Sequence, residues 1–286
     1  MNDQCNARCK FCIGHLVHKQ EWPNFETQKS RIAYAATHLG IKEFLVLGGE
    51  PTINPDMFKY VDYIKSLGAN KVCTTTNGHR LAKDKSYAER FFASGLTHVN
   101  ISLMATQREQ QCYITGSKTF VSLDDMRDFK QMADKNGVML RVNNNVFVDN
   151  NDSLEEILEF YRQVRNYCHS VKFSPLLKTD SFSTVNEVTE FNRTHILSDE
   201  CYDNLWHSVE EHFTEYPLVR NKETFGFVEY SMILLPAPII LNYNQHGQLR
   251  NKIVNERKIN NIKLLTTGEL SLSWNREEKD YFIECV

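Results

Sequence analysis

Short hydrophobic runs alternate with stretches of helical periodicity over the first two thirds of the chain. The runs are rich in β-branched and aromatic residues and predict five strands, at Glu43–Leu47, Lys71–Thr75, His98–Leu103, Val138–Val142 and Ser170–Phe173. Their starts are 28, 27, 40 and 32 residues apart, which leaves room for a crossover helix each time. This alternation predicts an α/β fold with a parallel sheet flanked by helices, either an open sheet or a partial barrel.

The segments between the strands place apolar residues on single helical faces. Two clear examples are the sets Met57, Tyr60, Val61, Ile64, Leu67 and Leu154, Ile157, Leu158, Tyr161, Val164. Helices are expected to begin after the cap-type residues Asp56, Ser122 and Ser153, and Ser153 has capping-box spacing to Glu156. Ligands of such folds lie at the carboxyl ends of the strands, so we expect the functional residues there.

The pattern changes after Leu177, and we predict a barrel domain over residues 1–177 and an α+β extension over 178–286. Thr179–Thr194 is polar and is predicted to be a loop. Asp199–Glu215 is predicted to be a helix, with Cys201, Leu205, Val209 and Phe213 facing inward. The rest is β-like, with runs at Phe225–Leu235, Ile239–Tyr243, Ile262–Leu265 and Leu270–Trp274, and a hairpin turn at Thr267-Gly268.

Composition excludes several classes of protein. Hydrophobic residues make up 41% and charged residues 24% of the 286, as in globular proteins. No apolar run is long enough to span a membrane, and the first residues lack the apolar core of a signal peptide. The net charge of −3 disfavours nonspecific nucleic-acid binding. Three of the eight cysteines lie within eight residues, which indicates metal binding in a reducing cytosol, so we expect a cytoplasmic protein.

The strongest chemical signal is the C-x3-C-x2-C run Cys5, Cys9 and Cys12. Three thiolates on one loop can bind three irons of a [4Fe–4S] cluster and leave the fourth iron open. The alternative is a closed structural zinc site, because His15 follows Cys12 by three positions and would complete a Cys3His set. Spacing alone leaves both possibilities open.

A second motif, Gly48-Gly49-Glu50-Pro51, directly follows the first predicted strand. The two glycines let the backbone approach a ligand closely, and Glu50 provides a carboxylate for a cationic amine. Taken alone, such a sequence is compatible with an ordinary turn. Its position about 36 residues beyond the cysteine run makes that explanation weak.

The two motifs together resemble the radical S-adenosylmethionine (SAM) superfamily, and most closely the branch of the molybdopterin cyclase and the viperin-like enzymes. The resemblance covers residues 2–177 and implies a partial (β/α)6 TIM-like barrel. It implies one [4Fe–4S] cluster on Cys5, Cys9 and Cys12, whose open iron binds the amino and carboxylate groups of SAM. Phe11 would lie by the adenine, and Gly48, Gly49 and Glu50 would hold the methionine amine.

Weaker matches to the family lie at the ends of the later strands. Asn77 belongs to a Thr-Asn-Gly turn, and Ser102 matches a serine that contacts the ribose of SAM. Arg141 and Asn143 match polar residues that reach the ribose or the carboxylate, and Leu176 matches a residue that packs on adenine. Each also has a structural explanation, as a turn, strand or core residue.

The resemblance implies an enzyme that cleaves SAM reductively and generates a 5′-deoxyadenosyl radical, with an electron donor such as flavodoxin or ferredoxin. The sequence assigns no catalytic side chain. We expect a small polar substrate such as a nucleotide; a peptide is the alternative within the family. His79, Arg80 and Lys118 could contact an anionic substrate or lie on the surface, and Tyr230, Tyr243, His246 and Trp274 could cap it or close the barrel.

Two proteins of a different kind also fit the sequence. One is a zinc-stabilised α/β binding protein without catalysis, which would be colourless. The second is a family member that uses its cluster only structurally, which would be coloured but would not cleave SAM.

The chain departs from the family pattern in two ways. Only four residues precede Cys5, where relatives have a full strand, so we expect a stub strand or a start downstream of the natural N-terminus. Cys201 and Cys285 stand alone in the tail, which argues against an auxiliary cluster. We therefore expect a single cluster and interpret the scattered cysteines as buried apolar residues.

Overall fold

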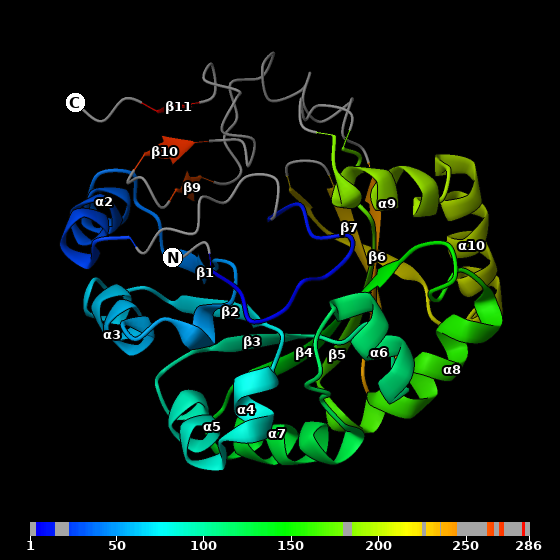
Figure 1. Cartoon of the computed structure of the whole chain (residues 1–286), viewed down its shortest axis with the longest axis horizontal. Helices are drawn as coiled ribbons and strands as arrows, with labels where there is room; N and C mark the ends of the chain where they lie inside the picture. Colours follow the sequence, from blue (N-terminus) through cyan, green and yellow to red (C-terminus); the bar gives the residue numbers. More distant parts are fainter. Residues whose placement is uncertain are drawn as a thin grey trace.

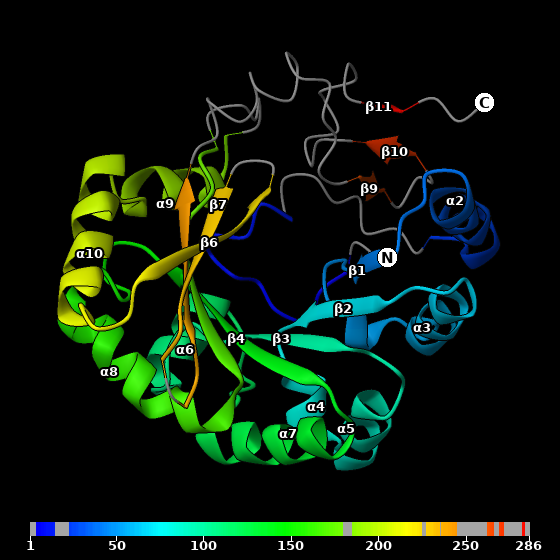
Figure 2. The same ribbon diagram turned by 180° about the vertical axis from the view of Figure 1, so that it is seen from behind.

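A curved sheet with helices on its outer face forms most of the molecule (Figures 1 and 2). The computed structural model describes residues 4–14, 23–179, 185–224, 227–234, 236–244, 262–265, 269–271 and 282–283. The eight strands of the sheet are β1 Glu43–Val46, β2 Lys71–Thr76, β3 His98–Ser102, β4 Met139–Val146, β5 Ser170–Pro175, β6 Leu218–Thr224, β7 Phe227–Met232 and β8 Ile239–Asn244.

The strands are ordered β1-β2-β3-β4-β5-β8-β7-β6. The strands from β1 through β5 to β8 are parallel, and β7 and β6 follow as antiparallel partners. The predicted partial barrel of six parallel strands is therefore confirmed. The five strands predicted in the first part of the chain are present, although β4 continues four residues beyond its predicted end.

Helices connect the strands, and most of them cover the outer face of the sheet (Figure 1). They are α2 Phe25–Thr37, α3 Met57–Ser66, α4 His79–Lys83, α5 Lys85–Phe92, α6 Arg108–Thr115, α7 Leu123–Lys135, α8 Leu154–Val164, α9 Glu187–His195 and α10 Asp199–His212, with 3-10 turns at Pro51–Ile53 and Arg165–Tyr167. Ser122 caps α7 in a reciprocal capping box with Asp125. Ser153 accepts from the Glu156 amide, whereas Asp56 makes no side-chain cap. Asn54 instead accepts a hydrogen bond from the Asp56 amide.

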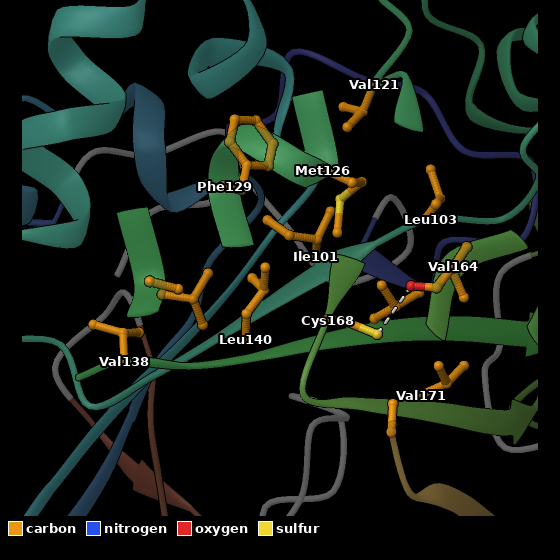
Figure 3. Close-up of a cluster of buried hydrophobic side chains, with 14 of the residues drawn as sticks. Ile101, Leu103, Val121, Met126, Phe129, Val138, Leu140, Val164, Cys168 and Val171 are labelled. Atoms are coloured by element: carbon orange, nitrogen blue, oxygen red, sulfur yellow. Dashed lines mark hydrogen bonds between the residues drawn. The ribbon is translucent and has the colours of Figure 1, made fainter. Parts of the chain in front are cut away.

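The apolar core lies between the sheet and the outer helices (Figure 3). Ile101 and Leu140 from adjacent strands are buried against Met126 and Phe129 of α7. Cys168 is part of this layer, and its thiol donates to the Val164 carbonyl over 3.5 Å. Burial raises its pKa to about 12, so it is a neutral packing residue.

Only some of the cysteines outside the N-terminal run are buried. Cys73 and Cys168 are buried as predicted, but Cys112 is half-buried and Cys201 is exposed. The inward face of α10 is instead formed by Tyr202, Leu205, Trp206 and Val209. The predicted inward position of Cys201 is therefore wrong, because the helix presents the next residue to the core. Cys285 lies outside the described residues.

The polar stretch predicted to be a loop contains α9. Asn186 caps this helix in a reciprocal capping box with Thr189, and Val188 and Asn192 are buried on its inner face. The prediction failed because few apolar residues mark that face. The strand β6 was also not predicted; it pairs with β7.

The C-terminal part of the chain contributes to the same sheet, because β8 pairs with β5 in parallel. A small antiparallel sheet of β9 Lys263–Leu264, β10 Leu270–Ser271 and β11 Phe282–Ile283 follows. It lies beside α2 (Figure 1), where the Gln28 side chain donates to the Leu265 carbonyl over 3.0 Å. The predicted turn at Thr267-Gly268 and the residues His246 and Trp274 lie outside the described residues, as does the side chain of Tyr243.

Candidate cluster and cofactor site

The segment that carries the three N-terminal cysteines lies across the carboxyl end of the sheet. The amide of Glu50 donates to the Gln4 carbonyl over 2.7 Å, which ties the start of the segment to the turn after β1. The amides of Arg8 and Lys10 donate to the carbonyls of Thr115 and Ile114, over 2.8 and 3.0 Å, at the end of α6. The segment is therefore held by two elements that are far from it in sequence.

Asn77 connects the same segment to the end of β2. Its side-chain nitrogen donates to Asn6 Oδ1 over 2.7 Å and lies 3.8 Å from Cys5 Sγ. Its side-chain oxygen accepts from the His79 amide over 3.0 Å, which fixes the orientation of the amide group. The structure thus places Asn77, which the family pattern indicates only weakly, in contact with a candidate cluster ligand.

The thiols of Cys5, Cys9 and Cys12 interact electrostatically with one another. Burial raises the pKa of Cys5 to about 11 and that of Cys9 still further, and the neighbouring thiols add to both shifts. Such thiols stay protonated unless a cation compensates the negative charge of the thiolates. This donor set fits an iron–sulfur cluster, in which separate irons take one thiolate each.

The zinc alternative requires His15, which lies outside the described residues. Among the residues that the structure does describe, no three His, Cys, Asp or Glu side chains converge closely enough to hold one metal ion.

Glu50 is buried and joins the turns after the first two strands. Its Oε1 accepts from the Thr52 amide at 3.0 Å and from the hydroxyls of Thr52 and Thr76 at 2.6 and 2.5 Å. Its Oε2 accepts from the Asn77 amide at 2.7 Å. Burial raises the pKa of this carboxyl, and the four hydrogen bonds oppose the rise. Glu50 therefore has a structural function that was not predicted, while its predicted contact with the SAM amine stays a prediction.

The register of the central strands brings three other predicted residues together. Side chains on β4 alternate, so that Leu140, Val142 and Val146 are buried while Arg141 and Asn143 lie on the opposite, partly accessible face. Asn143 is in register with Ser102 of β3. Residues in register share one face of a sheet, so Ser102, Arg141 and Asn143 lie together on the concave side.

Phe11 and Leu176 also belong to one group of side chains. Leu176 is buried in an apolar cluster with Met104, Ile114 and Phe147, and Phe11 packs against that cluster. The ring centroids of Phe11 and Phe147 are 5.8 Å apart. The two residues predicted to flank adenine are thus brought together although 165 positions separate them in the sequence.

The possible anion contacts have different surroundings. Arg80 donates to the Thr52 carbonyl over 2.6 Å and lies 3.8 Å from the centre of the Tyr87 ring. His79 is buried, and burial, with a smaller effect of Lys83, lowers its pKa to about 4. It is neutral at physiological pH and cannot serve as a cation there. Lys118 is exposed.

Sequence reasoning missed Asn192 of α9, whose side-chain nitrogen donates to the Phe11 carbonyl over 3.1 Å. Nothing in the local sequence distinguishes this residue, because it lies in a polar stretch. The hydrogen bonds from the hydroxyls of Thr52 and Thr76 to Glu50 were also not predicted, although Thr76 belongs to the Thr-Asn-Gly turn. The only sequence signal for these contacts was the presence of a threonine next to the Gly48–Glu50 turn and another next to Asn77.

Residues 1–191 match the sequence pattern of the radical SAM superfamily. The chain belongs to this superfamily. The predicted family is thereby confirmed, and with it an enzyme whose cofactors are SAM and a [4Fe–4S] cluster. No described helix has both the length and the apolar character needed to cross a membrane.

Two relatives of known sequence are both named as GTP 3′,8-cyclases. The chain is 27% identical over 226 residues to GTP 3′,8-cyclase of Haemophilus influenzae strain 86-028NP, a match that covers 76% of this chain and 63% of the relative. It is 34% identical over 165 residues to a probable GTP 3′,8-cyclase of Saccharolobus islandicus strain M.14.25 / Kamchatka #1. This match covers 57% of this chain and 50% of the relative. The chain thus spans less than two thirds of the length of these relatives.

Solved structures share the fold. SuiB of Streptococcus suis bound to S-adenosylmethionine is similar, with a TM-score of 0.57 and 18% identity over 75% of this chain and 46% of SuiB. Native anSMEcpe with bound AdoMet and a peptide has a TM-score of 0.53 and 15% identity, over 75% of this chain and 58% of anSMEcpe. At such identities the similarity establishes the partial-barrel fold and nothing about the substrate.

Proposed function

We propose that this protein binds SAM at the carboxyl end of its partial barrel and uses it to abstract hydrogen from a small polar substrate, most specifically a nucleotide. The observation that carries the proposal is the anchoring of the cysteine segment to the turns after β1 and β2 through Gln4 and Asn77. It brings the candidate cluster ligands and the Gly48–Glu50 turn to one place. When bound, a reduced cluster supplies the electron that cleaves SAM to methionine and a 5′-deoxyadenosyl radical.

The protein's own residues bind and orient the reacting groups. In this proposal Cys5, Cys9 and Cys12 hold the cluster, and Gly48, Gly49 and Glu50 position the methionine amine. Phe11 and Leu176 pack against adenine, and Asn77, Ser102, Arg141 and Asn143 contact the polar part of SAM. Packing of this kind excludes water and stray hydrogen donors from a reactive radical.

Polar residues on the concave face of the sheet support a polar, anionic substrate. Lys172 of β5 is in register with Asn143, so both a lysine and Arg141 lie on this face. Asn242 of β8 donates to Ser174 Oγ of β5 over 3.0 Å on the same side. Cationic and hydrogen-bonding groups in one concavity suit phosphate and sugar oxygens. The relatives named GTP 3′,8-cyclase favour a nucleotide over a peptide.

The proposal includes three further features. The electron donor is a flavodoxin or ferredoxin, and the protein acts in the cytoplasm. Residues 1–177 form the barrel domain, and the extension over 178–286 adds its sixth parallel strand, β8. Because β8 pairs with β5, we expect the two parts to unfold together in one cooperative transition.

The function is tested by anaerobic reconstitution with iron and sulfide, followed by a SAM cleavage assay under reducing conditions. We expect a brown protein that forms 5′-deoxyadenosine faster with GTP or another nucleotide than with a peptide or without substrate. A colourless protein that binds zinc tightly and does not cleave SAM would contradict the proposal. A brown protein that never cleaves SAM would show that the cluster is only structural. Stimulation by a peptide alone would identify the peptide-modifying alternative.

A further inference from the structure

Asn192 connects α9 to the cysteine segment from a fully buried position, with 1% of its surface exposed. Its Nδ2 donates to the Phe11 carbonyl over 3.1 Å and to the Val188 carbonyl over 2.8 Å. Phe11 precedes Cys12 directly, so this side chain holds the backbone next to a candidate cluster ligand.

These two contacts fix the orientation of the amide group. An amide nitrogen has two N–H donors, and both are directed at carbonyl oxygens. The reverse orientation would place Oδ1 against the same two carbonyls and would be repulsive. Oδ1 is therefore the free end of the side chain, and it is buried without a hydrogen-bond partner among the described residues.

A buried acceptor without a donor is destabilising, because it has lost its hydrogen bonds to water and gained none in the protein. A folded protein tolerates such an atom where a ligand completes it. The atom at Asn192 lies beside Phe11, whose ring packs against the buried cluster of Phe147 and Leu176. The surroundings therefore suit a flat ring with apolar faces and an N–H donor on its edge.

We propose that Asn192 Oδ1 accepts a hydrogen bond from the exocyclic amine of the SAM adenine. Asn192 then acts as a specificity residue for the cofactor, and α9 joins the cofactor site to the part of the chain beyond β5. The inference rests on the proposed binding of SAM next to the cysteine segment. It assigns this side chain a ligand contact in addition to its contact with Phe11.

The test compares two ligands in two proteins. The ligands are SAM and an analogue whose adenine amine is replaced by hydrogen. Binding is measured anaerobically on cluster-loaded protein by equilibrium dialysis, together with the change that each ligand causes in the electron paramagnetic resonance spectrum of the reduced cluster. We expect the natural protein to bind SAM roughly fivefold to a hundredfold more tightly than the analogue.

In Asn192→Ala this preference is expected to fall below about twofold, because the acceptor that distinguishes the ligands is gone. Asn192→Asp retains an acceptor oxygen and should retain the preference, with weaker binding of both ligands because the Phe11 carbonyl loses its donor. Arg193→Ala is the matched control: this neighbour on α9 is exposed, pairs with Glu190, and should leave both affinities unchanged.

The outcomes separate the two hypotheses. If the natural protein binds neither ligand, the proposed function fails. If it binds both equally, or if a cluster-loaded Asn192→Ala protein keeps the full preference, the adenine contact is wrong while SAM binding stands. If the alanine variant does not take up its cluster, loss of the preference in the aspartate variant would overturn the inference.

Discussion

The protonation and the position of the cysteine thiols in the candidate site depend on the residues around them. The thiols of Cys5 and Cys9 are deprotonated only where positive charge compensates them, since burial and the repulsion of neighbouring thiols, Cys12 among them, raise their pKa values. Asn77 contacts Cys5, and Asn192 contacts the residue before Cys12. The ligand loop is thus shaped by amide side chains that are not themselves ligands of the cluster.

Replacing Cys9 with alanine is expected to remove the visible absorbance of the reconstituted protein and all formation of 5′-deoxyadenosine, because one iron loses its thiolate. Iron analysis and absorbance spectroscopy measure the first effect and product chromatography the second. Cys201→Ala is the control, since this cysteine is exposed on α10. A Cys9→Ala protein with normal iron content and activity would show that the cluster lies elsewhere.

The buried imidazole of His79 makes the stability of the fold depend on pH. Burial lowers its pKa to about 4, against an ordinary value of about 6.5. Between these values the unfolded chain takes up a proton that the native protein does not, so stability falls as the pH decreases through this window. The loss approaches roughly 3 kcal/mol near pH 4.

Chemical denaturation at pH 7 and at pH 4.5 measures this dependence. His79→Gln should lose the part of the pH dependence that His79 contributes, while His207→Gln, an exposed change on α10, should behave like the natural protein. Identical pH profiles for the natural protein and His79→Gln would contradict the assignment.

Contacts between elements position the site as a whole. Glu50 follows β1 and binds groups that follow β2, so one carboxylate sets the relative position of two strand ends. Arg80 and Tyr87 both donate to the carbonyl of Thr52 and extend this contact to α4 and α5. α9 contacts the cysteine segment at another point, where Asn192 donates to the Phe11 carbonyl.

Glu50→Ala is therefore expected to lower the free energy of unfolding by about 2–4 kcal/mol, because the hydroxyl of Thr76 and two backbone amides lose their acceptor. It should also weaken SAM binding roughly tenfold to a hundredfold, since one charge-assisted contact is lost. Denaturant unfolding and a SAM titration measure the two effects. The shape-matched Glu50→Gln keeps an acceptor oxygen and should lose less stability, which separates the hydrogen bonds from the charge. An unchanged SAM affinity in a folded Glu50→Ala protein would remove the Gly48–Glu50 turn from the site.

The whole molecule is a partial barrel in which the C-terminal part of the chain packs against earlier elements at two places. β8 extends the parallel sheet beyond β5, and the small sheet of β9 to β11 packs beside α2 through Gln28 (Figure 2). Within the described part of the chain, the remaining cysteines are distributed over different elements, from β2 to α10. No second group of thiols is formed there.

We therefore predict about four irons per chain after full reconstitution. Simultaneous replacement of Cys168, Cys201 and Cys285 with alanine should leave the iron content unchanged and lower stability, mainly through the buried Cys168. Iron and sulfide analysis of both proteins measures this. About eight irons in the natural protein, falling to four in the triple variant, would demonstrate an auxiliary cluster and favour a peptide-modifying enzyme.

The sequence by itself determined those features whose residues are close together in the chain. Local sequence patterns were enough to predict the cysteine run of Cys5, Cys9 and Cys12, the Gly48–Glu50 turn and the five early strands. The assignment to the superfamily also depended on these local patterns. The helix α9 escaped because its capping residue Asn186 and its buried face stand in a polar run with little periodicity.

Only the tertiary structure decided which distant residues meet. Thr76 reaches Glu50 across 26 positions, and Asn192 reaches Phe11 across 181. The parallel pairing of β8 with β5 likewise joins segments separated by two helices and two strands, α9, α10, β6 and β7. A hydrogen-bonding side chain has the same local sequence signal whether its partner is solvent or another element. Its function is therefore fixed by the packing that brings the two together and removes water from between them.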